Sequence, residues 1–359
     1  AKIAKKFHNT AVSLNFVPQI QNYIMEHRKL TRYLISLIMI LIIVGLAEWT
    51  DEKEILFPEM TALIIGLLII DKRVWNVKRW QIILLMTLGA AVGICIVRYS
   101  PLPYVVNLCA AFAFAGASLL ISRATLIPLI SACVLPVLLH TESIVYPIAV
   151  FSMSVSVVLV QIILEKCGIR NRMPKTVGRK PGKEDIIRWL ILFCFVGALA
   201  ELAVGMDYPY IILPPLMVTF VEMVNSKAGF RNRPTQVFLF LTTVATLGTV
   251  LQIVGHHHLH LPESIVALTI TAILFLIFEW TGKYFAPAGA LAFIPMLLPK
   301  ENLGWLPLEA SIGAALFITI AMVVFQKCYK WNRAQLIFCA TPTLLREYMN
   351  RKKRKKQIE

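Results

Sequence analysis

The residues best suited to binding a solute lie in one apolar stretch, 285–295, which holds two prolines and a glycine. Proline removes a backbone donor, so a helix through Pro287 and Pro295 is short or broken. In a bilayer such a break must be buried in protein or line a cavity. One interpretation is a kinked helix that only packs against its neighbours. The other is a half-helix whose N-terminus faces a substrate, with the binding residues Pro287, Ala288, Gly289 and Ala290.

Basic residues precede this stretch and a second proline-containing stretch. Lys283 stands before 285–298 and Arg123 before 124–139, where Thr125 adds a hydroxyl group. A cation beside a helix N-terminus combines its own charge with free backbone N–H groups, and together these favour an anion. The alternative is that both cations are ordinary flanks at the cytoplasmic ends of membrane helices.

Glutamates inside or at the ends of apolar runs are candidates for carrying protons. Glu222 lies in 217–224, where Thr219 is the only other polar residue. A carboxylate at this depth costs roughly 2.5–3.5 kcal/mol on insertion scales unless it is paired or protonated. Glu222 is therefore a proton-coupling group, a residue of the inner interface, or the partner of Lys283 in a salt bridge. Other apolar runs end at Glu48, Glu201 and Glu279.

A histidine cluster lies between two apolar runs on the predicted outer side: His256, His257, His258 and His260. Imidazoles at this spacing could bind zinc. The alternative is a polar turn, because Glu263 alone is available to complete a catalytic set and no P-loop pattern is present. We therefore expect no enzymatic activity, no catalytic or metal-binding residue and no cofactor.

The composition places all of these residues in a membrane protein. The chain has 359 residues, is 58% hydrophobic and has a mean hydropathy of +0.71, which is unlike a soluble globular protein. Apolar runs recur from residue 32 to 325, and charges are confined to the gaps between them. We expect an all-α polytopic membrane protein. No signal peptide is expected, because residues 1–30 carry basic residues and no apolar core.

The basic residues fall on one side of the predicted membrane. Of the 36 Lys and Arg residues, all but Lys53, Arg98 and Lys300 lie in alternate gaps or in the terminal segments. This positive-inside pattern predicts that both termini are cytoplasmic, and we expect the bacterial plasma membrane. It also argues against a nucleic-acid partner. The basic tail 351–356 is expected to lie against anionic lipid.

Twelve apolar segments divide equally between two halves. The first half contains 32–49, 55–70, 81–97, 104–122, 124–139 and 145–164, and the second contains 187–204, 211–224, 237–254, 264–280, 285–298 and 307–326. Landmarks recur in the same order: Pro58 and Pro215, Gly93 and Gly248, Pro136 and Pro299. Six segments per half predict two parallel repeats about an axis along the membrane normal. The expected divisions are 1–31 (interfacial helix), 32–167, the basic linker 168–186, 187–328 and the basic tail 329–359.

Several of these segments are too short to span a bilayer as a helix. A span of ~30 Å needs about 20 helical residues. Segments two and five of each half are therefore expected to be half-helices or to lie in a thinned region of the membrane. Pro58, Thr61 and Pro215 are the candidate site residues of segment two. Segments four and five either both cross or together re-enter from outside. In the second case Arg123 and Lys283 lie deep in the protein.

The stretch 286–291, Ala-Pro-Ala-Gly-Ala-Leu, resembles the His-Pro-Pro-Ala-Gly-Ala signature of the HPP integral membrane family. The shared core is Pro-Ala-Gly-Ala, and the likeness in order and spacing covers roughly 40–167 and 195–328. The chain therefore looks like a tandem duplication of that family's unit. It differs in having Phe285 and Ala286 for the first His-Pro, and the first half keeps almost none of the signature. The resemblance implies small-solute transport, and plant members are linked to nitrite.

Three hypotheses for function follow. The first is a transporter or channel for a small anion such as nitrite or a carboxylate, with its site near the midplane between the halves. The second is an exporter of aromatic or amphipathic acids, against which the lack of a large soluble domain counts. The third is a membrane-embedded lipid-handling enzyme, for which only the histidine cluster speaks. The small-molecule substrate, the bilayer and a second copy of the chain are the expected partners.

Overall fold

The computed structural model describes the backbone of residues 2–172, 180–225 and 233–329, and the side chains of 26–172, 180–225 and 233–325. Within these ranges the chain is helical and has no strand. Eight helices of the described chain are long and apolar enough to cross a membrane. They are α1 (Lys2–Thr50, crossing with 26–50), α3 (Arg79–Tyr99), α4 (Tyr104–Ser122), α6 (Val145–Lys166), α7 (Lys183–Gly205), α9 (Pro234–Leu251, continued by the π turn η4, Gln252–His258), α10 (Glu263–Thr281) and α13 (Leu306–Tyr329).

Four short helices occupy the predicted positions of segments two and five. They are α2 (Glu59–Ile64, continued by the π turn η2, Ile65–Ile69), α5 (Leu129–Leu139), α8 (Pro214–Asn225) and α11 (Ala286–Phe293). A proline stands within one residue of each N-terminus, where a missing N–H costs nothing. Short turns lie near these helices: η1 (Lys53–Ile55), η3 (Pro209–Ile212), η5 (Ile294–Met296) and α12 (Lys300–Leu303). The helices of each half therefore follow the order long, short, long, long, short, long.

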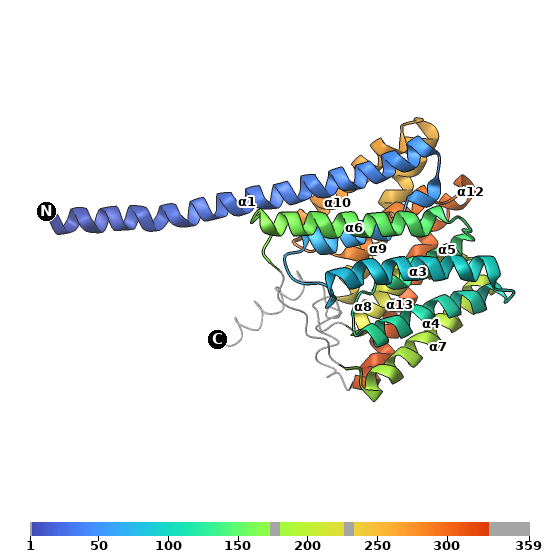
Figure 1. Ribbon diagram of the computed structural model, residues 1–359. Helices are drawn as coiled ribbons and strands as arrows, with labels where there is room; N and C mark the ends of the chain where they lie inside the picture. The colour runs from blue at the N-terminus through green and yellow to red at the C-terminus, as the bar shows by residue number, and fades with distance from the viewer. Residues whose placement is uncertain (1, 173–179, 226–232, 330–359) are drawn as a thin grey trace, which may run out of the picture.

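The N-terminal segment differs from the prediction. Instead of a separate interfacial helix over 1–31, α1 runs without a break from Lys2 to Thr50 and extends beyond the bundle (Figure 1). The reason is local, because residues 19–44 contain neither proline nor glycine and nothing ends the helix before the apolar run. The basic tail 330–359 and the linker residues 173–179 lie outside the described residues.

The two ends of the bundle differ in charge. We call the end at which α1 enters the bundle the basic end, and the other the opposite end. At the basic end, two ion pairs join neighbouring segments: Arg32 with Asp71, and Arg79 with Glu165 at 2.5 Å. Lys53, Arg98 and Lys300, the basic residues assigned to the outer gaps, all lie toward the opposite end. The backbone thus places the predicted cytoplasmic connections together.

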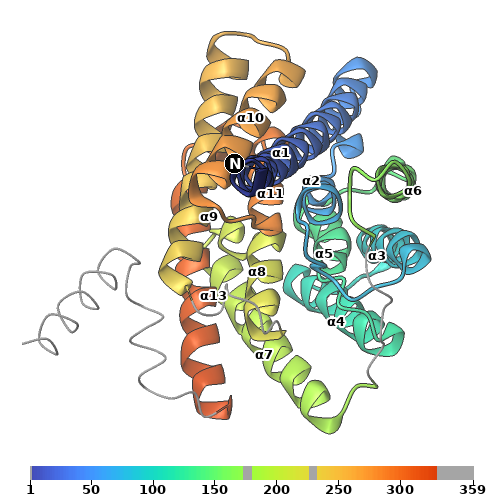
Figure 2. The ribbon, with the colours of Figure 1, turned by 90° about the vertical axis from the view of Figure 1, so that its left-hand side faces the viewer.

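The four short helices form the centre of the bundle. Every residue of 56–69, 129–138, 214–224 and 285–296 is buried. Around them, α1 packs against α10 and α4 against α7, while α2 packs against α11 and α5 against α8 (Figure 2). The long helices expose apolar side chains on their outer faces, including Leu34, Ile38 and Ile42 of α1. Helices that are apolar all round are expected where one face meets protein and the other meets lipid.

Two glycines allow α3 and α9 to touch the short helices closely. A Cβ at Gly93 would lie 2.5 Å from the carbonyl oxygen of Cys133, and one at Gly248 would lie 2.2 Å from that of Ala292. Pro136 and Pro295 are the next neighbours of these glycines, at 3.1 and 3.2 Å. Beside Gly248, Pro295 therefore takes the position that Pro136 takes beside Gly93. The pairing of Pro136 with Pro299 stays a prediction from the sequence.

Candidate functional site

A small cavity lies where the four short helices meet, and we call it the central cavity. It has about 10 Å³ of free volume, which is enough for about one water molecule. Its lining consists of Glu59, Ala62, Trp75, Pro128, Ser131, Pro215, Val218, Glu222, Ala286, Pro287 and Ala290. Both halves of the chain contribute to it, and the lining is mostly apolar. Two carboxylates, one hydroxyl group and one indole N–H are its chemically active groups.

Glu59 has no partner for its charge. It is the first residue of α2 and its residue exposure is 1%. Among the described residues, neither carboxylate oxygen has a hydrogen-bond partner, and the hydroxyl of Ser131 has none either. The first turn of a helix is a favourable place for negative charge. Even so, an ionised carboxylate buried without a partner is costly, which makes Glu59 the most unusual group in the bundle.

Glu222 has one donor. The indole Nε1–H of Trp75 donates to its carboxylate at 3.2 Å. Trp75 lies on the extended segment between η2 and α3, and its ring covers Gly66, where a Cβ would lie 2.4 Å from the ring. The predicted salt bridge between Glu222 and Lys283 was wrong. Lys283 lies in the connection between α10 and α11, where its ammonium donates to the side-chain oxygen of Gln236 at 2.5 Å.

Larger cavities open at the two ends of the bundle, each of about 370 Å³. The cavity at the opposite end is lined by residues of η1, α5, α6 and η3, among them Lys53, His140, Tyr146 and Tyr210. The cavity at the basic end is lined by the end of α4, the start of α7 and the end of α8. Its polar residues are Asn76, Arg123, Thr125, Glu184, Asp185, Arg188 and Asn225.

The three cavities follow one another along the same two segments of chain. Residues 119–127 line the basic-end cavity, Pro128 and Ser131 the central cavity, and 135–141 the cavity at the opposite end. On the facing segment, 224–225, then 215–222, then Tyr210 contribute in the same order. The cavities therefore form a row along these two segments, and the central one lies where α5 packs against α8.

The structure brings together only part of the predicted site. Pro215, Glu222, Pro287 and Ala290 line the central cavity. Pro58 and Ala288 are buried but are not part of its lining. Thr61 and Gly289 face each other where α2 crosses α11, and a Cβ at Gly289 would lie 3.1 Å from the Thr61 methyl group. At that position glycine allows helix contact, so these two residues have a packing role here.

The predicted cations lie away from the central cavity. Arg123 ends α4 with a φ of 55°, is exposed and lines the basic-end cavity with Thr125. Thr125 is held by Asn76, whose backbone N–H donates to the threonine hydroxyl at 2.7 Å. Burial and the neighbouring Arg233 guanidinium lower the pKa of the Lys283 ammonium. Neither Arg123 nor Lys283 is deep in the bundle, so the flank interpretation describes their positions.

Seven residues of the central cavity were not among the predicted ones, and three of these carry polar groups: Glu59, Trp75 and Ser131. Glu59 follows Pro58 and begins an apolar run, a position that in sequence looks like the end of the acidic outer gap 51–54. An acidic residue directly after the proline of a short segment was the available signal. Trp75 lies in a loop and Ser131 in an apolar run, and nothing in their spacing pointed to a shared cavity.

The histidine cluster is spread along one turn of the described chain. His256 lies in the π turn η4, with its Nε2 3.8 Å from the Glu263 carboxylate. No group of three or more potential ligands was found among the described residues.

Nearby, Glu48 accepts hydrogen bonds from the backbone N–H groups of Glu263 and Ser264 at 3.0 and 3.1 Å. This glutamate therefore caps α10, which is a structural role.

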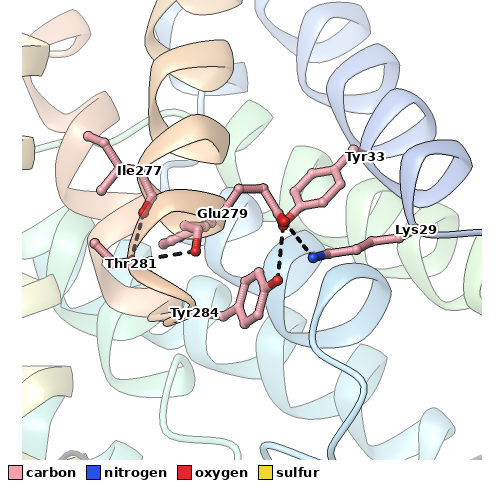
Figure 3. A network of polar contacts seen from close by, with 7 residues as sticks. Lys29, Tyr33, Ile277, Glu279, Thr281 and Tyr284 are labelled. Atoms are coloured by element: carbon pink, nitrogen blue, oxygen red, sulfur yellow. Dashed lines mark hydrogen bonds and ion pairs between the residues drawn. The ribbon is translucent and has the colours of Figure 1, made fainter. Parts of the chain in front are cut away.

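A second polar cluster joins the halves at the basic end (Figure 3). Glu279 of α10 accepts a hydrogen bond from Tyr33 of α1 at 2.5 Å and one from Tyr284 at 3.0 Å, and it forms an ion pair with Lys29 at 2.5 Å. All three donors point at one carboxylate, which is about half exposed. The cluster fastens α1 to α10. Its charges are matched, in contrast to the central cavity.

No protein-family model, curated protein or solved structure matches this chain. The central cavity and the row of cavities through it are therefore the features from which function must be inferred.

Proposed function

We propose that this protein is a membrane transporter for a small solute, which passes between α5 and α8. The row of three cavities carries this proposal, because the same two segments line a pocket at each end and a closed one between them. The central cavity holds only about one water molecule, so the path is closed here. A closed path with buried ionisable groups at its centre is typical of a transporter that opens to one side at a time.

Reciprocal helix packing supports the proposal that the halves are parallel repeats. In each half, the first helix packs against the fourth helix of the other half, and the second against the fifth (α1 with α10, α7 with α4, α2 with α11, α8 with α5). A two-fold axis produces such reciprocal contacts. With both halves running in the same direction, that axis lies along the bundle. The central cavity would then lie beside it, at the interface between repeats.

For the substrate we propose a small anion, as the resemblance to the HPP family implies. Cations take part in the lining of both outer cavities, Lys53 beside Glu54 at the opposite end, and Arg123 and Arg188 beside Glu184 and Asp185 at the basic end. Since Arg188 forms an ion pair with Asp185 at 3.3 Å, we propose Lys53 and Arg123 as the groups that an anion would meet first. At the centre, no lysine or arginine is part of the lining and two carboxylates are. An anion could pass them only when they are neutralised. Membership of the HPP family is a part of the same proposal.

Thiol accessibility tests the path without knowledge of the substrate. Ser131 and Ser154 are both completely buried, and among the described residues neither hydroxyl has a partner. Only Ser131 lines the central cavity. In a variant without the seven native cysteines, we expect Ser131→Cys to react with a small membrane-impermeant thiol reagent at least ~10-fold faster than Ser154→Cys, since the control reacts only by local unfolding. Equal rates would rule out the path.

The same variant tests the substrate class. Nitrite, acetate and chloride should slow the modification of Ser131→Cys if an anion occupies the path. Potassium and choline salts of one anion, compared at equal ionic strength, control for screening of the reagent. If none of the anions slows the modification, small anions of this kind are excluded as substrates. The path itself is tested separately, by the comparison of Ser131→Cys with Ser154→Cys.

A further inference from the structure

The carboxyl group of Glu59 is the group in this bundle that most needs a ligand, and the central cavity limits what that ligand can be. We propose that Glu59, together with Ser131, is a proton-binding site, and that the proton is taken up and released as the solute passes. The inference rests on the proposed transport path, because it assigns a coupling ion to the centre of that path. It concerns a residue that is buried at 1% exposure and aimed into the cavity.

The charges around the cavity require neutralisation. Glu59 and Glu222 both line it, and no lysine, arginine or histidine does. Trp75 supplies Glu222 with one N–H donor, whereas the donors near Glu59 are the hydroxyl of Ser131 and its own backbone N–H, neither in hydrogen-bond geometry. Two ionised carboxylates around a space for about one water molecule would repel each other in an apolar surrounding. At least one therefore needs a positive ligand when the cavity is closed.

A proton fits this cavity better than a metal ion. Sodium and other hard cations require several oxygen ligands at once. The lining offers two carboxylates and one hydroxyl group, and the other residues are alanine, proline, valine and tryptophan. No cluster of three potential side-chain ligands was found in the described chain. A proton needs a single oxygen atom and adds no volume, so it can be bound while the cavity stays closed.

Ser131 can serve both states of the carboxyl group. A hydroxyl group donates a hydrogen bond to a carboxylate and accepts one from a protonated acid. Its oxygen is completely buried and has no other partner in the described chain. Another titratable group beside Glu59 is Tyr146 on α6. The Tyr146 hydroxyl already donates to the carbonyl oxygen of Ala132 at 3.1 Å, which leaves Ser131 as the proton's neighbour.

The proton would also explain how an anion crosses the centre. With Glu59 ionised, the cavity carries negative charge and repels an anion. A proton from the solvent converts the carboxylate to a neutral acid, and its release on the other side restores the charge. An anion and a proton would then move together, and the protonated acid could donate a hydrogen bond to the passing anion. Lys53 and Arg123 would be the first contacts of the anion at the two mouths.

Infrared spectroscopy tests the proton directly. In purified full-length protein, we expect a carboxylic acid C=O band that persists at pH values at which exposed carboxyl groups are already ionised, is lost as the pH is raised further, and is absent over this pH range in Glu59→Gln. Glu165→Gln is the matched control: Glu165 is also buried, but it is paired with Arg79 and accepts a hydrogen bond from Gln161 at 2.9 Å. Its replacement should leave the band unchanged.

Other outcomes would overturn the assignment. A band that survives in Glu59→Gln, or that is lost only in Glu222→Gln, would place the proton elsewhere, and no pH-dependent band in the wild type would refute the proposal. If Glu59→Gln does not fold, Ser131→Ala should shift the pH midpoint of the band. An unshifted midpoint would count against the site. Thiol accessibility at Ser131 does not depend on the proton, so failure of the path and failure of the proton site are distinguishable.

Discussion

At the scale of single residues, the bond between Trp75 and Glu222 connects the central cavity to its surroundings. Trp75 lines the central cavity, and the next residue, Asn76, lines the basic-end cavity. The indole therefore lies at the boundary between the two cavities. Its N–H donates a hydrogen bond to Glu222, which also lines the central cavity. Removal of Trp75 from its place would open the central cavity toward the basic end and would also leave the carboxylate without a donor.

Replacement of Trp75 by phenylalanine should separate its ring from its N–H group. The ring can still cover Gly66, but Glu222 loses its donor. We expect the stability to fall by about 1–3 kcal/mol, the usual cost of an unsatisfied buried acceptor. The loss should be smaller in a Glu222→Met background, where no acceptor remains. Thermal unfolding of the four proteins measures the coupling, and equal losses in both backgrounds would mean that Trp75 acts through packing alone.

The sequence pointed to some of the residues of the central cavity and not to others. Glu222 stood out because it interrupts an apolar run, and Pro215, Pro287 and Ala290 because they break or narrow short segments. Glu59 did not, since its place beside an acidic gap made it look like a flank. Trp75 and Ser131 reach the cavity through tertiary packing of an extended loop and of α5. Such contacts leave no periodic mark in the sequence.

At the scale of helices, proline positions decided where the short elements fall. Because a proline near a helix start fixes the first turn and stops the helix from extending backwards, α2, α5, α8 and α11 were predictable within a few residues. The closeness of their packing depends on small residues facing them. Gly248 of α9 meets the backbone of α11 directly. Gly45 on α1, by contrast, has no atom within 4 Å of the place where its Cβ would be.

Two glycine substitutions should therefore have opposite effects. Gly248→Ala places a methyl group 2.2 Å from the carbonyl oxygen of Ala292, so α9 and α11 must separate. We expect a destabilisation of about 1–3 kcal/mol, as in other overpacked interiors. Gly45→Ala should be neutral or stabilising by up to about 1 kcal/mol, because alanine favours the helix. Thermal unfolding in one detergent compares them, and similar midpoints for the two variants would contradict the close contact.

At the scale of the molecule, the all-α architecture and the twelve segments followed from composition and hydropathy, while the way the halves meet did not. Hydropathy reports burial in lipid or protein but not which neighbour a helix chooses. The exchange of partners between halves, α1 with α10 and α4 with α7, is a property of the assembled bundle. So is the distance of Arg123 and Lys283 from the cavity, which their sequence positions before α5 and α11 could not show.

Orientation in the membrane is the property of the whole molecule that charge predicts most strongly. Of the 36 basic residues in the sequence, only Lys53, Arg98 and Lys300 belong to the gaps that the charge pattern assigns to the outside. Basic segments near membrane helices are retained in the cytoplasm. The chain passes between the two ends an even number of times, with a long, short, long, long, short, long order in each half. Both ends of the described chain therefore lie on the same side, and we predict that it is the cytoplasmic one.

Single cysteines at the two ends of the bundle test this orientation. In the cysteine-free background, Lys53→Cys and His140→Cys should react with an impermeant thiol reagent in intact cells. Arg172→Cys and Lys180→Cys, which are also at exposed positions, should react only after the membrane is opened. The reverse labelling pattern would mean that the basic end faces the outside. Trp75 would then separate the central cavity from the outside instead of from the cytoplasm. Reaction of all four in intact cells would mean that the two ends do not face opposite sides, and neither the charge argument nor the transport path would survive that result.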